Sequence, residues 1–130
     1  MTRLTIAIPN YNGGKNLQRA IESCKKIKIP LEDYEILIAD NCSTDNSIDI
    51  INELNNEFSN LVLIKNKENV GRIQNWNVCL ENAKGKYLIF LFSNDMINEL
   101  NKIHEILEIL DKNEKISIGF SSLLKKEIDN

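Results

Sequence analysis

The sequence predicts an α/β domain of three layers, α/β/α, with helices on both faces of a mainly parallel sheet. Short apolar runs rich in β-branched residues alternate with longer stretches in which apolar residues recur every three or four positions. The short runs are apolar at nearly every position, as in strands that are covered on both faces. Because strands joined by helices pair in parallel through right-handed crossovers, this alternation indicates a parallel sheet between two helical layers.

Four segments are expected as strands and four as helices. The apolar runs predict strands at residues 4–8, 35–39, 61–64 and 87–92, and residues 116–120 are the candidate for a fifth strand. The four helices are expected to bury these apolar faces: Leu17, Ala20, Ile21, Cys24 and Ile27; Ile48, Ile51 and Leu54; Ile73, Trp76, Leu80 and Ala83; Leu100, Ile103, Leu107 and Leu110. Pro30 and Gly85 mark where the first and third helices stop.

Length and charge narrow the class of protein. With 130 residues, 42% of them hydrophobic, the chain is large enough for one core, and no linker or repeat divides it. The 16 Lys and Arg residues are outnumbered by 19 Asp and Glu residues. Because a net charge of -3 gives no positive field for a phosphate backbone, we expect no nucleic-acid partner.

The cysteines and the apolar runs bear on location. Cys24, Cys42 and Cys79 are an odd set without a C-x-x-C pair, so neither a disulfide framework nor a zinc site is expected. No run approaches the roughly 20 apolar residues of a membrane span, and the apolar run after Met1 is too short for a signal-peptide core. These features favour a cytoplasmic protein and leave peripheral attachment to the inner face of the membrane open.

Polar segments follow every predicted strand. They are residues 10–12, 40–45, 69–72 and 93–95. Ligands of parallel sheets bind outside the carboxyl ends of the strands, so these segments are the candidate site. They contain what a nucleotide needs: a ring for the base at Tyr11, an acceptor at Asp40, a cation at Arg72, and a carboxylate at Asp95 that can bind a divalent cation.

Four short sequence motifs of this chain occur together in one known family. They are I-P-N-Y-N at residues 8–12, I-A-D-N-C-S-T-D-N-S at 38–47, N-x-G-R at 69–72 and A-x-G-x-Y-x-x-F-L at 83–91. In this order and spacing the chain resembles the family 2 glycosyltransferases over residues 1 to about 110. The resemblance implies the GT-A fold and the transfer of a sugar from a nucleotide-diphosphate sugar. The donor expected first is a UDP-sugar, the cofactor Mn²⁺ or Mg²⁺, and the outcome inversion at the anomeric carbon.

The resemblance also implies roles for individual residues. Pro9 and Tyr11 border the base and Asp40 contacts it. Further along the nucleotide lie Asn69, Gly71, Arg72 and Asn94, and Asp95 holds the metal ion. The acceptor, a saccharide or a lipid-linked molecule, is not specified, and no catalytic residue is assigned.

Two features depart from the family. Where members commonly carry an acidic D-x-D-D cluster, residues 92–95 read Phe-Ser-Asn-Asp, so a cation should bind more weakly. Members also continue into an acceptor-binding half that carries the general base. We therefore expect residues 1–130 to form a single GT-A nucleotide-binding region without that half, truncated relative to the family. Apolar surface left uncovered by the missing half predicts a homodimer involving residues 116–124.

Other interpretations stay open. A non-catalytic nucleotide-binding or assembly module would have the same fold. A dinucleotide-binding or P-loop domain is disfavoured, since neither G-x-G-x-x-G nor G-x-x-x-x-G-K-[ST] follows the first strand. Residues 40–45 could be only a helix-capping turn, Asn69 and Gly71 only a turn with positive φ, and Tyr11 a packing residue. Trp76 is expected in the core and His104 on the surface.

Overall fold

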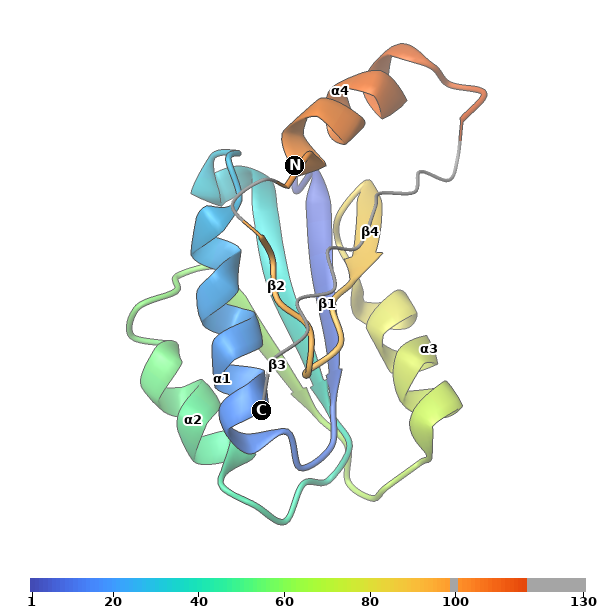
Figure 1. Ribbon diagram of the computed structural model, residues 1–130. Coiled ribbons are helices and arrows are strands. Elements are labelled where there is room, and N and C mark those ends of the chain that lie inside the picture. Colours follow the sequence, from blue (N-terminus) through green and yellow to red (C-terminus); the bar gives the residue numbers. More distant parts are fainter. Residues whose placement is uncertain (99–100, 117–130) are drawn as a thin grey trace, which may run out of the picture.

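The strands lie side by side in the order β3-β2-β1-β4, and every pairing is parallel (Figure 1). They are β1 (Leu4–Asn10), β2 (Tyr34–Asp40), β3 (Leu61–Lys65) and β4 (Tyr87–Phe90). The computed structural model describes residues 1–98 and 101–116. Within those residues the predicted parallel α/β sheet is confirmed, with strand bounds within two residues of those expected.

Helices cover both faces of the sheet. Helices α1 (Gly14–Ser23) and α2 (Ser47–Leu54) lie together on one face, and α3 (Arg72–Asn82) lies on the other (Figure 1). Short 3₁₀ turns, Cys24–Lys26 and Leu31–Asp33, join α1 to β2. None of the helices that the structure describes is long and apolar enough to cross a membrane.

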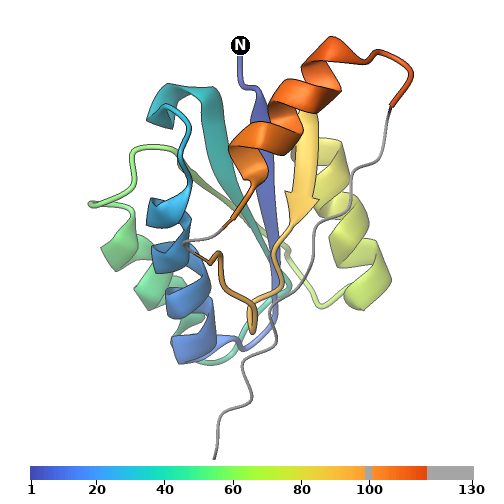
Figure 2. The same ribbon diagram turned by 45° about the horizontal axis from the view of Figure 1, so that its top comes forward.

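The fourth helix, α4 (Ile103–Lys112), packs on the same face as α1, near the amino ends of β1 and β4 (Figure 2). Ile103 and Leu107 enter the core. Asp111 ties the helix to the sheet, because its carboxylate contacts the guanidinium of Arg3 at 2.8 Å and the ammonium of Lys86 at 2.8 Å, and accepts a hydrogen bond from the hydroxyl of Tyr87 at 2.8 Å.

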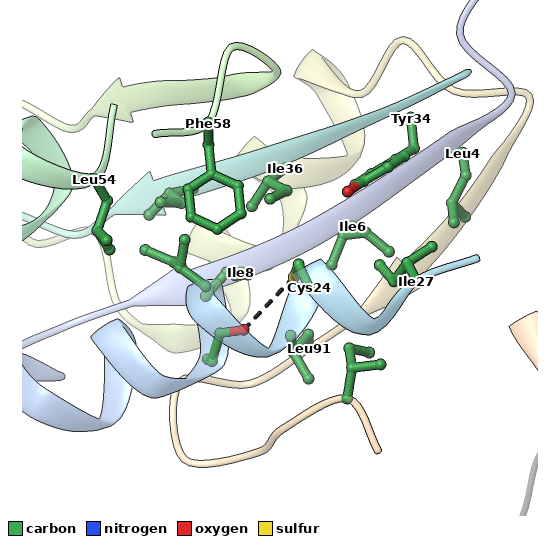
Figure 3. Packing of buried hydrophobic residues seen from close by; sticks show 14 of the residues in the cluster. Leu4, Ile6, Ile8, Cys24, Ile27, Tyr34, Ile36, Leu54, Phe58 and Leu91 are labelled. Carbon is green, nitrogen blue, oxygen red and sulfur yellow. Dashed lines mark hydrogen bonds between the residues drawn. The ribbon is translucent and has the colours of Figure 1, made fainter. Parts of the chain in front are cut away.

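The main core lies between the sheet and α1, α2 and α4 (Figure 3). Alternate residues of each strand point into it, such as Ile6 and Ile8 of β1 and Ile36 of β2, because side chains alternate across a sheet. Cys24 lies in the same cluster, 3.5 Å from the carbonyl oxygen of Ala20. All three cysteines are free, and burial raises the pKa of the Cys24 thiol to about 12, so this thiol stays protonated.

The opposite face is covered more thinly, and here the expected buried face of α3 is wrong. Ile73 and Leu80 are 61% and 55% exposed, whereas Asn75 and Cys79 are buried. Cys79 packs against the small side chains of Ala7 in β1 and Ala39 in β2. Small residues at this contact let the helix approach the sheet closely, and Asn75 adds a hydrogen bond to the carbonyl of Ala39 at 2.9 Å.

Other expectations differ in detail or cannot be compared. The sheet pairing of β4 stops at Phe90, and residues 92–95 turn away with the backbone N–H of Asp95 bonded to the carbonyl of Phe92 at 2.8 Å. In α2, Ile50 is buried in addition to Ile51 and Leu54. Ile116 is not in a strand, and residues 117–120 of the candidate fifth strand lie outside the described residues, as does Leu100.

The strand order places a site at the carboxyl ends of β1 and β4. From β1 the chain proceeds outward through β2 to β3 and then crosses back to pair β4 with the other side of β1. The helix that follows β1, α1, and the helix that leads into β4, α3, therefore lie on opposite faces of the sheet. Such a reversal opens a crevice at the carboxyl edge.

Candidate functional site

A pocket of about 520 Å³ opens at this carboxyl edge. We call it the strand-end pocket. Its wall is built from four separate stretches of chain: Pro9, Asn10 and Tyr11; Asn41; Asn69, Arg72, Asn75 and Trp76; Phe92, Ser93 and Asn94. Segments up to about eighty residues apart in sequence thus meet at one place, as parallel strands ending at one edge require.

Five of the eight residues expected at the site line this pocket. They are Pro9, Tyr11, Asn69, Arg72 and Asn94. Gly71 lies next to two of them at the start of α3, and Asp95 follows Asn94, but neither belongs to the wall. Asp40 is also outside the wall. Their roles toward a nucleotide stay predictions.

Asp40 is turned toward the protein. It is 2% exposed, and its carboxylate accepts hydrogen bonds from the side-chain N–H of Asn10 at 2.9 Å and from Ser43, through the backbone N–H at 3.0 Å and the hydroxyl at 2.6 Å. A buried carboxylate needs such partners, because an unpaired charge in the interior is very costly. In this arrangement Asp40 orders the loop after β2, and Asn41, the next residue, reaches the pocket.

A second contact ties the loops after β1 and β2 together. Asn12 has φ 52°, in the left-handed region that Asn tolerates better than most residues. The side-chain oxygen of Asn12 accepts hydrogen bonds from the backbone N–H groups of Thr44 at 2.8 Å and Asp45 at 3.2 Å. The backbone N–H of Asn12 donates to the hydroxyl of Ser43 at 2.9 Å. These hydrogen bonds of Asn12 fix the position of the neighbouring Tyr11, which remains 52% exposed.

Four asparagines form a connected network along one wall. The amide of Asn41 donates to Asn69 at 2.9 Å and accepts from Asn66 at 3.1 Å. Asn66 also donates to Asn75 at 2.8 Å, and Asn75 in turn donates to the carbonyl of Ala39. Because the members satisfy one another, the network is rigid and adds no charge.

Another part of the pocket wall is aromatic. Trp76 and Phe92 have ring centroids 5.5 Å apart and tilted by 48°, and Phe90 stacks behind Phe92 at 6.1 Å. The guanidinium of Arg72 lies 5.8 Å from the centre of the Trp76 ring, within the range of a cation–π contact. The sequence expectation that Trp76 lies in the core therefore differs from its place in the pocket wall, where it is half-buried.

The charges of the site are few. Among the described residues that line the pocket, Arg72 is the only one with a charged side chain, and none carries a carboxylate. Within the described residues no group of three His, Cys, Asp or Glu side chains could hold a metal ion. Asp95 is half-buried and supplies the only carboxylate of the turn at 92–95. One carboxylate fits a divalent cation that takes its other ligands from phosphate and water, but makes no complete site by itself.

Sequence reasoning missed several wall residues. Asn10 and Asn41 lie within the segments 10–12 and 40–45 that were chosen as the candidate site, but neither was given a role of its own. Asn75 and Trp76 lie three and four positions after Arg72, the spacing that shares a helix face. Phe92 was considered only because it stands where family members commonly have the first carboxylate of the D-x-D-D cluster.

The strings that suggested a family are matched by a model of that family, described as Glycosyl transferase family 2, over residues 5–126. The chain belongs to glycosyltransferase family 2.

Individual family members can be compared with this chain. The poly(ribitol-phosphate) beta-glucosyltransferase of Bacillus spizizenii is 35% identical over 96 residues, which are 73% of this chain and 15% of that protein. The crystal structure of residues 1–349 of Staphylococcus aureus TarS in complex with UDP superposes with a TM-score of 0.78 at 26% identity, covering 87% of this chain and 33% of that one. The same TarS region is also solved with UDP-GlcNAc.

A more distant structure shares the fold alone. The mannosyltransferase PcManGT from Pyrobaculum calidifontis, in complex with GDP-Man and Mn²⁺, matches with a TM-score of 0.68 at 20% identity, covering 72% of this chain and 28% of that one. Together with TarS it confirms the predicted GT-A arrangement of this family 2 chain. The chain spans less than a fifth of the full B. spizizenii and S. aureus proteins, 15% and 17% respectively.

Proposed function

We propose that the strand-end pocket binds the nucleotide part of a UDP-sugar, and that this chain is the donor-binding region of a glycosyltransferase that works with inversion. The observation that carries the proposal is the convergence of Tyr11, Asn69, Arg72 and Asn94, from three separate polar segments, on one pocket at the carboxyl edge of a family 2 domain. The TarS complexes with UDP and UDP-GlcNAc support uridine as the first nucleotide to test.

Each end of the nucleotide has a suitable surface. Tyr11, exposed between its clamped loops and next to Pro9, offers a ring face to a base. Asn41 also lines the pocket, but protein groups use both N–H groups and both acceptor positions of its amide. We therefore assign Asn41 to shaping the wall and let Asp40 act on the base edge through Asn10 and Ser43.

The diphosphate would lie at the start of α3. Gly71, with φ 84° and ψ 164°, brings the chain into the helix, where Arg72 supplies positive charge. The first backbone N–H groups of the helix have no partner within it and point along its axis. A phosphate group is favoured by both.

A divalent cation, Mn²⁺ or Mg²⁺, would be held at the turn by Asp95 together with the diphosphate. Such an ion neutralises charge on the leaving nucleoside diphosphate. The Mn²⁺ in the PcManGT complex is consistent with this cofactor. Asn94 would hydrogen-bond to a ribose hydroxyl without adding charge.

The acceptor and the general base are left to regions that the relatives have and this chain does not span. We place the reaction in the cytoplasm, where a peripheral position at the membrane would bring a lipid-linked acceptor within reach. A non-catalytic nucleotide-binding or assembly module is a second candidate, because none of the pocket-lining residues that the structure describes carries a carboxylate. Release of UDP from a UDP-sugar would separate the two, since only the enzyme produces it.

Calorimetric titration with UDP, GDP and dTDP in the presence of Mn²⁺ tests the binding proposal. Arg72→Gln should weaken UDP binding about 10- to 100-fold, because it removes a charge-assisted hydrogen bond to phosphate. Arg19→Gln, an exposed arginine of α1 outside the pocket, is the matched control and should bind like the wild type. If none of the three nucleotides bound, the family and the fold would stand and the proposed function would not.

A further inference from the structure

The aromatic wall presents one ring to the pocket in a fixed orientation. Phe92, Trp76 and Phe90 form a mutual cluster: the Phe92 ring lies 5.5 Å from Trp76 and 6.1 Å from the nearly parallel ring of Phe90, and those two rings are 6.2 Å apart. Phe92 nevertheless remains 37% exposed, and it lines the pocket together with Trp76, whereas Phe90 does not. The cluster therefore supports an apolar face that is open to a ligand.

Unused polar groups gather beside this ring. The wall amides of Asn41, Asn69 and Asn75 are engaged in hydrogen bonds with protein groups. By contrast, the side chains of Ser93 and Asn94, directly after Phe92, make no hydrogen bond within the described residues. Ser93 and Asn94 therefore place a hydroxyl and an amide directly beside the Phe92 ring in the pocket wall.

A flat apolar face bordered by a hydroxyl and an amide suits a sugar ring, which has C–H groups on its faces and hydroxyls at its rim. Arg72 lies over Trp76 and places a phosphate-binding cation against the same wall. We propose that Phe92, backed by Trp76, is a stacking surface for a sugar ring of the ligand, with Ser93 and Asn94 binding its hydroxyls. The proposal rests on the proposed function and assigns a subsite to it.

The test must separate the aromatic face of Phe92 from its apolar bulk, because the proposal depends on the aromatic face. Phe92→Leu removes the aromatic face, and Phe92→Tyr keeps it. Phe90→Leu makes the same chemical change in the neighbouring ring, which does not line the pocket. Trp76 is the single tryptophan of the chain, so its fluorescence reports on ligands at this wall. Thermal melting confirms that each variant is folded.

Affinities for UDP and for UDP-GlcNAc are measured by titration of Trp76 fluorescence in each variant. Phe92→Leu should weaken sugar binding about 2- to 12-fold, the range expected for loss of an aromatic contact. Phe92→Tyr and Phe90→Leu should stay within about twofold of the wild type, a difference below about 0.5 kcal/mol. Equal losses for both ligands would place the ribose on Phe92, and a loss confined to UDP-GlcNAc would place the transferred sugar there.

Two results would overturn the stacking surface. Unchanged affinity of Phe92→Leu for both ligands would show that the ring takes no part, and an equal loss in Phe90→Leu would show that only the packing of the cluster matters. In both cases the nucleotide still binds, so the proposed function survives. If the wild type bound neither ligand, the proposed function would fail together with this inference.

Discussion

Among single residues, Asn94 and Asp95 are the two on which the proposed cation site depends. Asn94 lines the pocket and Asp95 lies beside it in the same turn. An amide can hydrogen-bond to a ribose hydroxyl as a carboxylate can, but it brings no negative charge to a divalent ion a few ångströms away. The ion would therefore depend on Asp95 and on the diphosphate, so its binding and that of the nucleotide should be coupled.

This coupling predicts that Mn²⁺ alone binds poorly, whereas Mn²⁺ with UDP binds measurably. Asn94→Asp should tighten binding of the ion by restoring a carboxylate, and Asp95→Ala should make UDP binding independent of the metal. Calorimetric titration of UDP in Mn²⁺ and in EDTA measures both effects. Asp45→Ala, which removes a carboxylate outside the pocket wall, serves as the control.

The same UDP affinity in Mn²⁺ and in EDTA, for the wild type and for both variants, would contradict this prediction. Residues 92–95 would then be an ordinary turn after β4, and charge at the diphosphate would come from Arg72 and the start of α3.

Asp40 and Asn41 show how far single positions can be predicted from sequence. The strand-end segment was predictable, because the apolar run stops there. Which of the two side chains faces the pocket was not, since it depends on Asn10 and Ser43, and Asn10 is brought to Asp40 from thirty residues away by the pairing of β1 with β2. A pattern within one segment contains no information on that partner.

Among the elements, the positions of the strands were predicted well, but the buried face of helix α3 was predicted badly. Both outcomes follow from relying on hydrophobicity alone. Strands of a parallel sheet are apolar on both sides, so their position follows from composition alone. Helix α3 covers a small cluster built on Ala7 and Ala39, and the close approach selects Asn75 and Cys79 over the larger Ile73 and Leu80. Hydrophobicity alone ranks these four residues in the opposite order.

The turn between α3 and β4 should be intolerant of any side chain at Gly85. A Cβ there would lie 2.4 Å from the backbone nitrogen of Thr5 and 2.6 Å from the carbonyl carbon of Leu4, and backbone atoms cannot move aside. Gly85→Ala should lower the free energy of unfolding by about 1–3 kcal/mol or more, as overpacking does. Urea denaturation measures it. UDP affinity should be unchanged under native conditions, because this turn lies at the amino ends of the strands.

Gly71→Ala is the informative counterpart. A Cβ at Gly71 would meet nothing within 4 Å, but φ 84° with ψ 164° is a region that essentially only glycine occupies. The expected cost is about 1–3 kcal/mol of backbone strain, and relief of that strain would move Arg72, so UDP affinity should fall as well. A loss of stability with unchanged UDP affinity would count against the placement of the diphosphate at the start of α3.

Acid should loosen α4 before it unfolds the sheet. The hydrogen bond from Lys86, followed by those from Tyr87 and Arg3, lowers the pKa of Asp111 from 3.8 to about 2. A lowered folded-state pKa means that the stabilisation is complete above the unfolded value and is lost as pH falls from about 3.8 through about 2. The protection factors of the α4 amides, which correct for the pH dependence of intrinsic exchange, should therefore fall in that pH range.

Asp111→Asn provides the control for this acid response. The α4 amides of the variant should have low protection factors already at neutral pH, and these should change little as acid is added, because the titrating group is gone. An identical pH profile in the wild type and in Asp111→Asn would assign the acid response to other carboxylates.

For the whole molecule, the described part of the sheet ends in an open edge at β4. That strand pairs with β1 on one side, and no described strand pairs with its other side. Apolar side chains are exposed nearby, among them Ile73 and Leu80 on α3 and Met96 after β4. An open strand edge next to apolar surface favours association with another chain. These features add to the expectation of a homodimer, whose predicted segment, residues 116–124, is described only at Ile116.

We therefore expect a dimer or larger species at concentrations in the tens of micromolar. Leu80→Glu should shift the population toward monomer, because burying a charge in the contact would cost far more than the leucine contributes. Leu31→Glu changes an exposed residue of the turn before β2, which β1 separates from β4, and should leave the association unchanged. Light scattering coupled to size-exclusion chromatography gives the mass directly. A strict monomer for the wild type would rule out the dimer, and equal dissociation in both variants would place the contact elsewhere than beside β4.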